Sequence, residues 1–447
     1  MVIQTLGLAL IACLLSRGPG LATDEADADW SQVTFDEEVS VEELKSDEEQ
    51  PELGEVIDTA THTETAGDSQ NMAAQSDFAV DVTDISWPDQ VAAPIEIEPL
   101  FVQAFTDVEP GHNDSNPIWS PTGDLIAFER SIEDRREIII SRFDGTVLQK
   151  IYHRIPEENS EMDSVFADIL DDVSYNAGIS WSPDESKLVF MSNGGSGNYD
   201  LYLLPILGQE QTIRLTDHAE KDSHPHWSPV ADRLVFVSGR TGSADIYLMD
   251  LVSGNVAKLT NGHKTYLYPQ WSPDGSKIVM INGSNENHDI FLIEDINRPL
   301  QAIKALTRWE YDDLRPAWSP DGKKIAFYSN YNLENNPKIW SIVVIAADGS
   351  SAADGEGLAS RVVAVNVIPD IERGPAWMPD SKRLVYVKND HRTYNPIYMV
   401  QIEEKKNQPI NTQTKMNHDL ACSADGTFAF RAQVEQWDHI YIARLKE

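Results

Sequence analysis

Cysteine is nearly absent, because the 447 residues include only Cys13 and Cys422. Cys13 lies in an apolar stretch at the N-terminus, so a chain that lost this stretch would keep Cys422 alone. Intramolecular disulfides are then excluded as a source of stability. Walker-type phosphate loops, HExxH zinc motifs and cysteine pairs with metal-ligand spacing are also missing, so the common nucleotide and zinc enzymes find no support in the sequence.

Basic residues are scarce as well. Lys and Arg number 35 against 73 Asp and Glu, which gives a formal net charge of -38 at pH 7. Such a field repels phosphate, because binding to nucleic acid or to anionic lipid headgroups needs clustered Lys and Arg. We therefore expect no nucleic-acid partner.

No apolar run reaches the ~20 residues that a membrane-spanning helix needs. Residues 1–16 are apolar, and Gly20 and Ala22 follow with the spacing of a cleavage site. This pattern predicts a secretory signal peptide over residues 1–22, although it lacks a cation at its start. A periplasmic or secreted location follows. Leu10-Ile11-Ala12-Cys13 also resembles a lipoprotein signal, in which case Cys13 would carry lipid and tie the chain to a membrane.

Residues 23–94 lack the periodicities of both helix and strand. Acidic and small polar residues fill this segment, and Lys45 is its only cation. Such a composition cannot offset the entropy of ordering by burying apolar surface. The segment is predicted to be an acidic disordered linker.

The remaining residues, 95–447, repeat one phrase. Six copies read NPIWSPTGDLIAF, GISWSPDESKLVF, HPHWSPVADRLVF, YPQWSPDGSKIVM, RPAWSPDGKKIAF and GPAWMPDSKRLVY, and a degenerate seventh reads DLACSADGTFAF. We call the central residue of each copy its anchor: Trp119, Trp181, Trp227, Trp271, Trp318, Trp377 and Cys422. Successive anchors lie 62, 46, 44, 47, 59 and 45 residues apart. A unit of about 45 residues that is rich in short strands predicts the blades of a β-propeller.

Each copy contains four strand patterns, of which the fourth ends in Leu-Thr in several copies. The last copy lacks a fourth strand, but residues 100–106 fit the pattern and precede the first copy. We expect this N-terminal strand to complete the last blade, which would leave no sheet edge exposed. The predicted fold is an all-β propeller of four-stranded blades. Seven blades follow from the anchors, or six if the degenerate copy forms none.

WSPDG-x-x-IAF followed by D-I-Y-x-M-D resembles the repeats of the TolB-like propeller family. The resemblance covers residues 95–447 and implies a non-enzymatic binding or scaffold protein. Such a protein would present a propeller face, as a monomer, to a protein or glycan partner in the cell envelope. TolB itself has a folded domain where this chain has its acidic segment, and it has six blades. Propeller-bearing peptidases need a G-x-S-x-G nucleophile turn, whereas the nearest string, residues 194–197, is predicted to be a plain turn.

The candidate binding site is a ring of residues three positions before the anchors. The innermost strand of a blade begins there, beside the central opening of a propeller. The residue types differ among the copies, which is typical of a binding face in repeat proteins. The candidate residues at this channel mouth are Asn116, His224, Tyr268, Arg315 and Asp419.

Asp222, His224 and His226 form the densest group of metal-capable side chains. Imidazole and carboxylate suit Zn, Mn or Ni. Oligogalacturonate lyases place a His-rich metal site in a seven-bladed propeller that is similar to the one predicted for this chain. A metal-dependent propeller enzyme acting on polysaccharide is therefore the alternative function. A binding protein would need no cofactor, and solvated histidines at a strand end are the simpler interpretation of this group.

Overall fold

The computed structural model describes residues 102–106, 110–132, 135–151, 176–194, 198–206, 211–261, 265–283, 287–331, 336, 338–350, 358–370, 372–389 and 394–445. The predicted signal peptide, Cys13 and the acidic linker lie outside the described residues, so they stay predictions.

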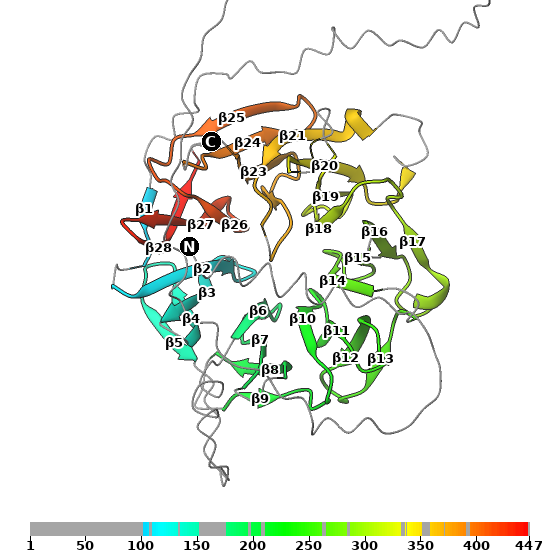
Figure 1. Cartoon of the computed structure of the whole chain (residues 1–447). Coiled ribbons are helices and arrows are strands. Elements are labelled where there is room, and N and C mark those ends of the chain that lie inside the picture. Colours follow the sequence, from blue (N-terminus) through cyan, green and yellow to red (C-terminus); the bar gives the residue numbers. More distant parts are fainter. Residues whose placement is uncertain are drawn as a thin grey trace, which may run out of the picture. The chain divides into compact units, whose positions relative to one another are not determined.

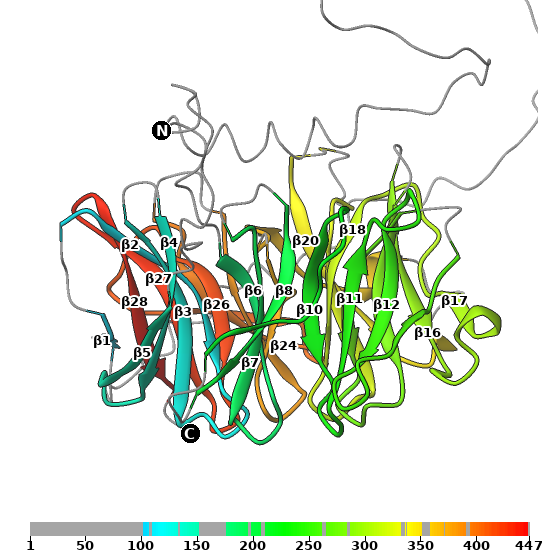
Figure 2. The ribbon, with the colours of Figure 1, turned by 90° about the horizontal axis from the view of Figure 1, so that it is seen from below.

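Seven four-stranded antiparallel sheets form a ring around a central opening (Figure 1). Each sheet is one blade, and its strands follow one another from the central opening outward in six of the seven cases. The view turned by 90° shows the strands running between the two faces of the ring (Figure 2). The predicted propeller of seven blades is confirmed, and the degenerate seventh copy does form a blade.

Blades 1 to 3 contain the first twelve of the strands that follow β1. Blade 1 comprises β2 (His112–Trp119), β3 (Leu125–Ile132), β4 (Arg135–Arg142) and β5 (Val147–Ile151). Blade 2 comprises β6 (Asn176–Trp181), β7 (Lys187–Ser192), β8 (Asp200–Pro205) and β9 (Ile213–Arg214). Blade 3 comprises β10 (Asp222–Trp227), β11 (Arg233–Ser238), β12 (Asp245–Asp250) and β13 (Val256–Lys258). Every innermost strand here ends at its anchor tryptophan.

Blades 4 to 7 follow the same plan. Blade 4 comprises β14 (Thr265–Trp271), β15 (Ile278–Gly283), β16 (His288–Ile293) and β17 (Ile303–Ala305). Blade 5 comprises β18 (Asp313–Trp318), β19 (Lys324–Ser329), β20 (Trp340–Ala346) and β21 (Val362–Val367). Blade 6 comprises β22 (Ala376–Trp377), β23 (Arg383–Val387), β24 (Ile397–Gln401) and β25 (Lys406–Ile410). Blade 7 comprises β26 (His418–Cys422), β27 (Thr427–Val434), β28 (Trp437–Arg444) and β1 (Val102–Ala104).

Two 3-10 turns, η2 (Pro299–Gln301) and η4 (Leu358–Arg361), interrupt the strands. Within the described ranges, no helix has the length and apolar character that crossing a membrane requires.

The ring is closed by strand β1, as the sequence predicts. Val102 pairs with Ala443 and Ala104 with Tyr441, so β1 is the outermost strand of blade 7. The backbone N–H of Phe105 also donates to the carbonyl oxygen of Ile440 at 2.7 Å. The residues from both ends of the propeller therefore share one sheet, in which β28 is paired on both sides.

The repeated tryptophan connects neighbouring blades. The indole N–H of Trp377 donates to the carbonyl oxygen of Ala317 at 3.1 Å, and Ala317 directly precedes the anchor of the preceding blade. Equivalent bonds run from Trp119 to Ala421, from Trp181 to Ile118 and from Trp318 to Gln270, at 3.2, 3.4 and 3.3 Å. Each such bond contributes on the order of 1 kcal/mol. Cys422 cannot donate it and instead lies 3.9 Å from the sulfur of Met378.

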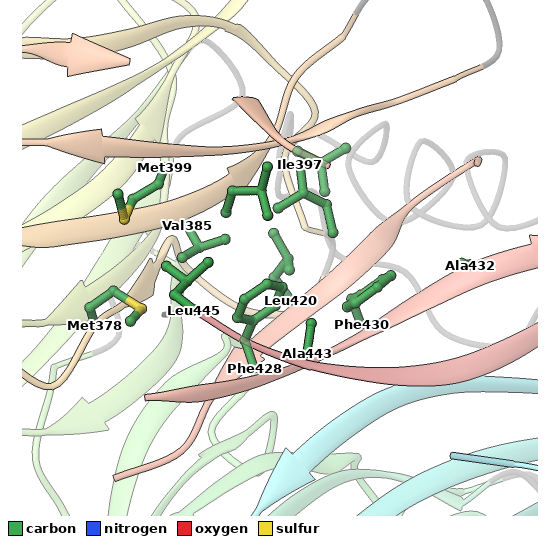
Figure 3. Packing of buried hydrophobic residues seen from close by; sticks show 12 residues of the cluster. Met378, Val385, Ile397, Met399, Leu420, Phe428, Phe430, Ala432, Ala443 and Leu445 are labelled. Atoms are coloured by element: carbon green, nitrogen blue, oxygen red, sulfur yellow. The ribbon is translucent and has the colours of Figure 1, made fainter. Parts of the chain in front are cut away.

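The hydrophobic core lies between adjacent sheets. Between blades 6 and 7, Phe428 and Phe430 pack with Val385, Met399 and Leu420, as Figure 3 shows. Both phenylalanines are fully buried. Burying one such side chain stabilises the fold by roughly 1.5–3 kcal/mol. The strand alternation seen in the sequence thus supplies one apolar layer to each side of every blade.

Candidate functional site

Six innermost strands carry the same backbone irregularity at the predicted ring. In β10, Ser223 pairs with Val237 and His226 with Val235, so two residues oppose one and a β-bulge results. The first bulge residue adopts a left-handed conformation in each of these six strands, with φ between 52° and 63°. These residues are Asn116, Gly178, His224, Tyr268, Arg315 and Asp419. Bulges re-aim side chains, and here they do so at the edge of the central opening.

Three successive blades bring their ring residues into one stack. The rings of His224 and Tyr268 meet edge to face, with centroids 4.5 Å apart and an interplanar angle of 80°. The guanidinium carbon of Arg315 lies 3.3 Å from the centroid of the Tyr268 ring. Blades 3, 4 and 5 each contribute one member, and we call the three side chains the mouth stack. A cation over an aromatic face is stabilising and fixes the plane of the guanidinium.

The mouth stack carries one positive charge at neutral pH. Burial, with help from Arg315 and Lys221, lowers the pKa of His224 to about 3, so its imidazole is neutral. Burial raises the pKa of Tyr268, which keeps the phenol protonated even though the Arg315 cation opposes the shift. Nη1 of Arg315 has no hydrogen-bond partner among the described residues. This nitrogen is itself buried, and a buried charged donor without an acceptor is a group that the acceptor of a bound ligand would satisfy.

Asn116 and Asp419 meet each other at the junction of blades 1 and 7. The backbone N–H of Asn116 donates to Oδ2 of Asp419 at 3.3 Å. Nε of Arg431 lies 2.8 Å from the same oxygen. Both Asn116 and Asp419 are buried, and Asp419 is neutralised by Arg431. This pair therefore belongs to the wall of the mouth rather than to its exposed surface.

The residues two positions further back point into the blades. Asp114 accepts two hydrogen bonds from Arg130, at 2.6 and 2.8 Å. Asp313 is fully buried, and its burial raises its pKa to about 8. Asp222 accepts two bonds from Nη2 of Arg240, at 3.1 and 2.9 Å. The carboxylates of Asp114 and Asp222 thus bind arginines of their own blades.

The predicted metal ligands are placed in different surroundings. Asp222 is paired with Arg240 inside blade 3, whereas His224 contacts Tyr268 of blade 4. Burial lowers the pKa of His226 to about 4, so this imidazole is also neutral. Across the part of the chain that the structure describes, no three His, Cys, Asp or Glu side chains gather closely enough to hold a metal ion.

Sequence reasoning missed several charged groups of the mouth. Glu129 of β3 is buried and lies 3.0 Å from Arg136 of β4. Burial raises the pKa of Glu129 to about 7, although Arg136 lowers it. Glu372 and Arg373 come from the segment before β22, which reaches into the central opening (Figure 1). The extra length of the 59-residue interval between the anchors Trp318 and Trp377 lies between β20 and β21, so it gave no signal for this segment.

The repeats match a known family. The family described as the TolB beta propeller domain matches residues 169–354. The matched residues carry TolB-like propeller repeats. The match begins before β6 of blade 2 and ends after β20 of blade 5, so it includes all three members of the mouth stack. Among curated proteins, no sequence matches this chain.

Solved structures of oligogalacturonate lyase share the propeller fold. A structure of oligogalacturonate lyase in complex with manganese is 13% identical, with a TM-score of 0.56, and the match covers 79% of this chain and 96% of the lyase. The oligogalacturonate lyase of Vibrio parahaemolyticus is 12% identical, with a TM-score of 0.55 and the same coverage. TolB from Acinetobacter baumannii is 16% identical over 75% of this chain and 65% of its own length, less than two thirds, with a TM-score of 0.42. Identities this low establish a shared fold alone.

Proposed function

We propose that this chain is an exported, non-enzymatic binding protein whose channel mouth holds a segment of a partner protein. The mouth stack carries the proposal, because it presents a neutral imidazole, an aromatic ring and a cation with an unpartnered nitrogen. Tyr and Arg are the residue types that dominate protein-binding hot spots. Export is supported by the predicted signal peptide over residues 1–22.

Blade geometry favours recognition over catalysis at this mouth. The two neutral groups, His224 and Tyr268, face one another and Arg315 rather than a nucleophile. The carboxyl groups nearest to the stack in sequence, Asp222 and Asp313, are turned into their blades. A rigid guanidinium that lies flat on a tyrosine offers its edge to a carboxylate or to backbone carbonyls at a small entropic cost.

The test uses the full-length chain as immobilised bait in an envelope extract. Arg315→Ala removes the unpartnered donor, and Arg444→Ala is the matched control. Arg444 is exposed and pairs with Asp425, in the turn after the seventh anchor. We expect the wild type and Arg444→Ala to retain the same proteins and Arg315→Ala to lose one or more of them. Retention of an identical set of proteins by all three chains would contradict the proposal. Retention of glycans instead of proteins would also contradict it, because the partner would then be a glycan.

A further inference from the structure

Blades 2, 3 and 4 repeat one arrangement around an aspartate of the third strand. In each of them a threonine just after the fourth strand donates its hydroxyl group to Oδ1 of this aspartate. The bonds run from Thr216 to Asp200, from Thr260 to Asp245 and from Thr307 to Asp289, at 3.1, 2.6 and 3.2 Å. The repeat therefore holds the three carboxyl groups in equivalent positions, and the residues around them can be compared directly.

The residue two positions before the threonine supplies a cation in blades 2 and 3. There, Nη2 of Arg214 lies 2.6 Å from Oδ2 of the blade 2 aspartate, and Nζ of Lys258 lies 2.8 Å from Oδ2 of the blade 3 aspartate. In blade 4 the residue at this position is Ala305. The strand register confirms the equivalence, because each of the three residues pairs with an aromatic residue of the third strand. Blade 4 thus has a methyl group where two other blades place a positive charge.

A second cation is replaced on the blade 5 side of the same junction. In blade 3, Asp222 binds the guanidinium group of Arg240, which stands two positions after the serine that pairs with Asp222. The equivalent pair in blade 5 is Asp313 with Ser329, and the residue two positions later is Tyr331. Asp313 is fully buried, and neither of its carboxyl oxygens has a hydrogen-bond partner among the described residues. A buried polar group of this kind is costly unless something satisfies it.

The two aspartates without an equivalent cation, Asp289 and Asp313, meet at the junction of blades 4 and 5. The backbone N–H of His288, directly before Asp289, donates to Oδ1 of Asp312 at 3.2 Å, and Asp312 directly precedes Asp313. Strands β16 and β18 also pack against each other. Burial raises the pKa of Asp313 to about 8, and the carboxyl groups of Asp289 and Asp312 add to this rise. The junction therefore gathers acidic groups from two blades.

The junction can be reached from solvent along the outer strand. At the equivalent positions the side chains of Arg214 and Lys258 are 44% and 31% exposed, although the aspartates that they bind are buried. Asp289 and Ala305 are themselves half-buried. A ligand can thus approach where the long side chains of blades 2 and 3 lie.

The surroundings suit an organic cation better than a metal ion. Among the residues that the structure describes, no three His, Cys, Asp or Glu side chains gather to hold a metal ion. In blades 2 and 3 the equivalent carboxylates accept from guanidinium and ammonium groups. Tyr311 and Tyr331 meet edge to face beside Asp312, with ring centroids 5.0 Å apart. Aromatic faces next to carboxyl groups favour organic cations.

We propose that the junction of blades 4 and 5 is a binding site for an organic cation, the ammonium or guanidinium group of a lysine or arginine side chain in a ligand. The ligand supplies from outside the charge that Arg214 and Arg240 supply at the junction of blades 2 and 3. Its N–H groups donate to the unpartnered oxygens of Asp313. An approaching cation favours the ionised form of this carboxyl group, so binding releases its proton. The site is separate from the mouth stack and does not depend on the proposed function.

The experiment is isothermal titration calorimetry of the full-length chain at pH 8.5 with three blocked pentapeptides. Each peptide has one central residue between glycines, which is lysine, arginine or the uncharged norleucine. We expect the lysine or the arginine peptide to bind at least tenfold more tightly than the norleucine peptide, because norleucine has an apolar stem without the charge.

Two variants locate the binding at the junction. Ala305→Lys supplies the cation from blade 4 itself, as Lys258 does in blade 3, so it should weaken binding of the cationic peptides at least tenfold and raise the melting temperature. Asp313→Asn removes the charge while keeping the shape of the side chain, and it should weaken the same binding. Ala257→Lys is the matched control, because it adds the same charge at an exposed position of β13. It should leave the affinities unchanged.

Three outcomes would overturn the inference. The first is equal affinity of the wild type for all three peptides. The second is an unchanged affinity for the cationic peptides in a folded Ala305→Lys variant. The third is binding of calcium chloride but of neither cationic peptide, because the junction would then take a metal ion. Thermal melting verifies the fold of each variant, and if Asp313→Asn does not fold, the comparison of Ala305→Lys with Ala257→Lys still decides the outcome.

Discussion

The backbone N–H of Ile440 donates to Oγ1 of Thr106 at 3.2 Å, across 334 positions of the sequence. In blades 2, 3 and 4 a threonine just after the fourth strand accepts the same bond from the third strand. These bonds join Leu201 to Thr216, Ile246 to Thr260 and Ile290 to Thr307, at 3.0, 3.0 and 2.9 Å. Phe105-Thr106 therefore takes the position in blade 7 that a Leu-Thr pair has in blades 2 to 4, although it comes from the N-terminal end of the propeller.

Thr106→Val should destabilise the propeller by about 1–2 kcal/mol. The substitution keeps the shape of the side chain but leaves the buried N–H of Ile440 without this acceptor. Thr216→Val removes the equivalent bond inside blade 2, so urea unfolding of both variants should show similar losses. If Thr216→Val is destabilised and Thr106→Val is not, strand β1 contributes little to closing the ring.

The indole bonds between blades predict a difference between two Trp→Phe substitutions. Trp377→Phe removes the bond to the carbonyl oxygen of Ala317. Trp271 is equally buried, but its indole nitrogen has no hydrogen-bond partner among the described residues. Trp377→Phe should therefore cost about 1 kcal/mol more than Trp271→Phe in equilibrium unfolding. Equal losses would show that the tryptophans act through packing alone.

The left-handed bulges predict an unusual order of stability among variants with substitutions at Arg315. Its φ of 53° is accessible to glycine and strained for a β-branched residue. Arg315→Val should therefore be less stable than Arg315→Gly by on the order of 1–3 kcal/mol. At Arg383, an ordinary position in strand β23, valine should be the more stable substitution because it favours strands. The same order at both positions, measured by thermal melting, would contradict the bulge at the mouth.

Glu129 predicts a pH dependence of stability. Its pKa is raised to about 7 in the folded protein, mainly by burial, from 4.5. A raised pKa means that the folded state binds the proton more tightly, so this stabilisation is complete below pH 4.5 and is lost as the pH rises to 7. Relative to Glu129→Gln, the wild type should lose up to about 3 kcal/mol across this window. A difference between the two proteins that does not vary with pH would show that Glu129 remains charged.

The sequence predicts the fold because the same pattern of strands and turns occurs seven times. Seven anchors with one turn chemistry define the blades, and residues 100–106 match the fourth-strand pattern closely enough to predict the closure. The ring at the mouth was predicted as a set of positions, since each position lies at a constant distance from an anchor. Its division into two groups was not predictable. Whether His224 meets Tyr268 depends on the neighbouring blade, 44 residues further along the chain. Whether Asn116 meets Asp419 depends on a blade 303 residues away.

The segment before β22 shows where the pattern fails. Glu372 stands at the same distance from its anchor as Asp222 and Asp313, which turn into their blades. In blade 6 the strand that would impose this direction is shortened to Ala376–Trp377, so Glu372 is free of the ladder. A counting argument assumes one backbone conformation for all copies, and it cannot detect the copy in which that conformation changes.

Hydrogen exchange on the full-length chain, with and without a partner captured by the bait, tests the central claim most directly. The account predicts added protection in peptides that contain His224, Tyr268 and Arg315. Peptides that contain the turn after Trp318, at the opposite end of the same strand as Arg315, should exchange as in the free protein. Protection at that turn without protection of the mouth stack would contradict the account.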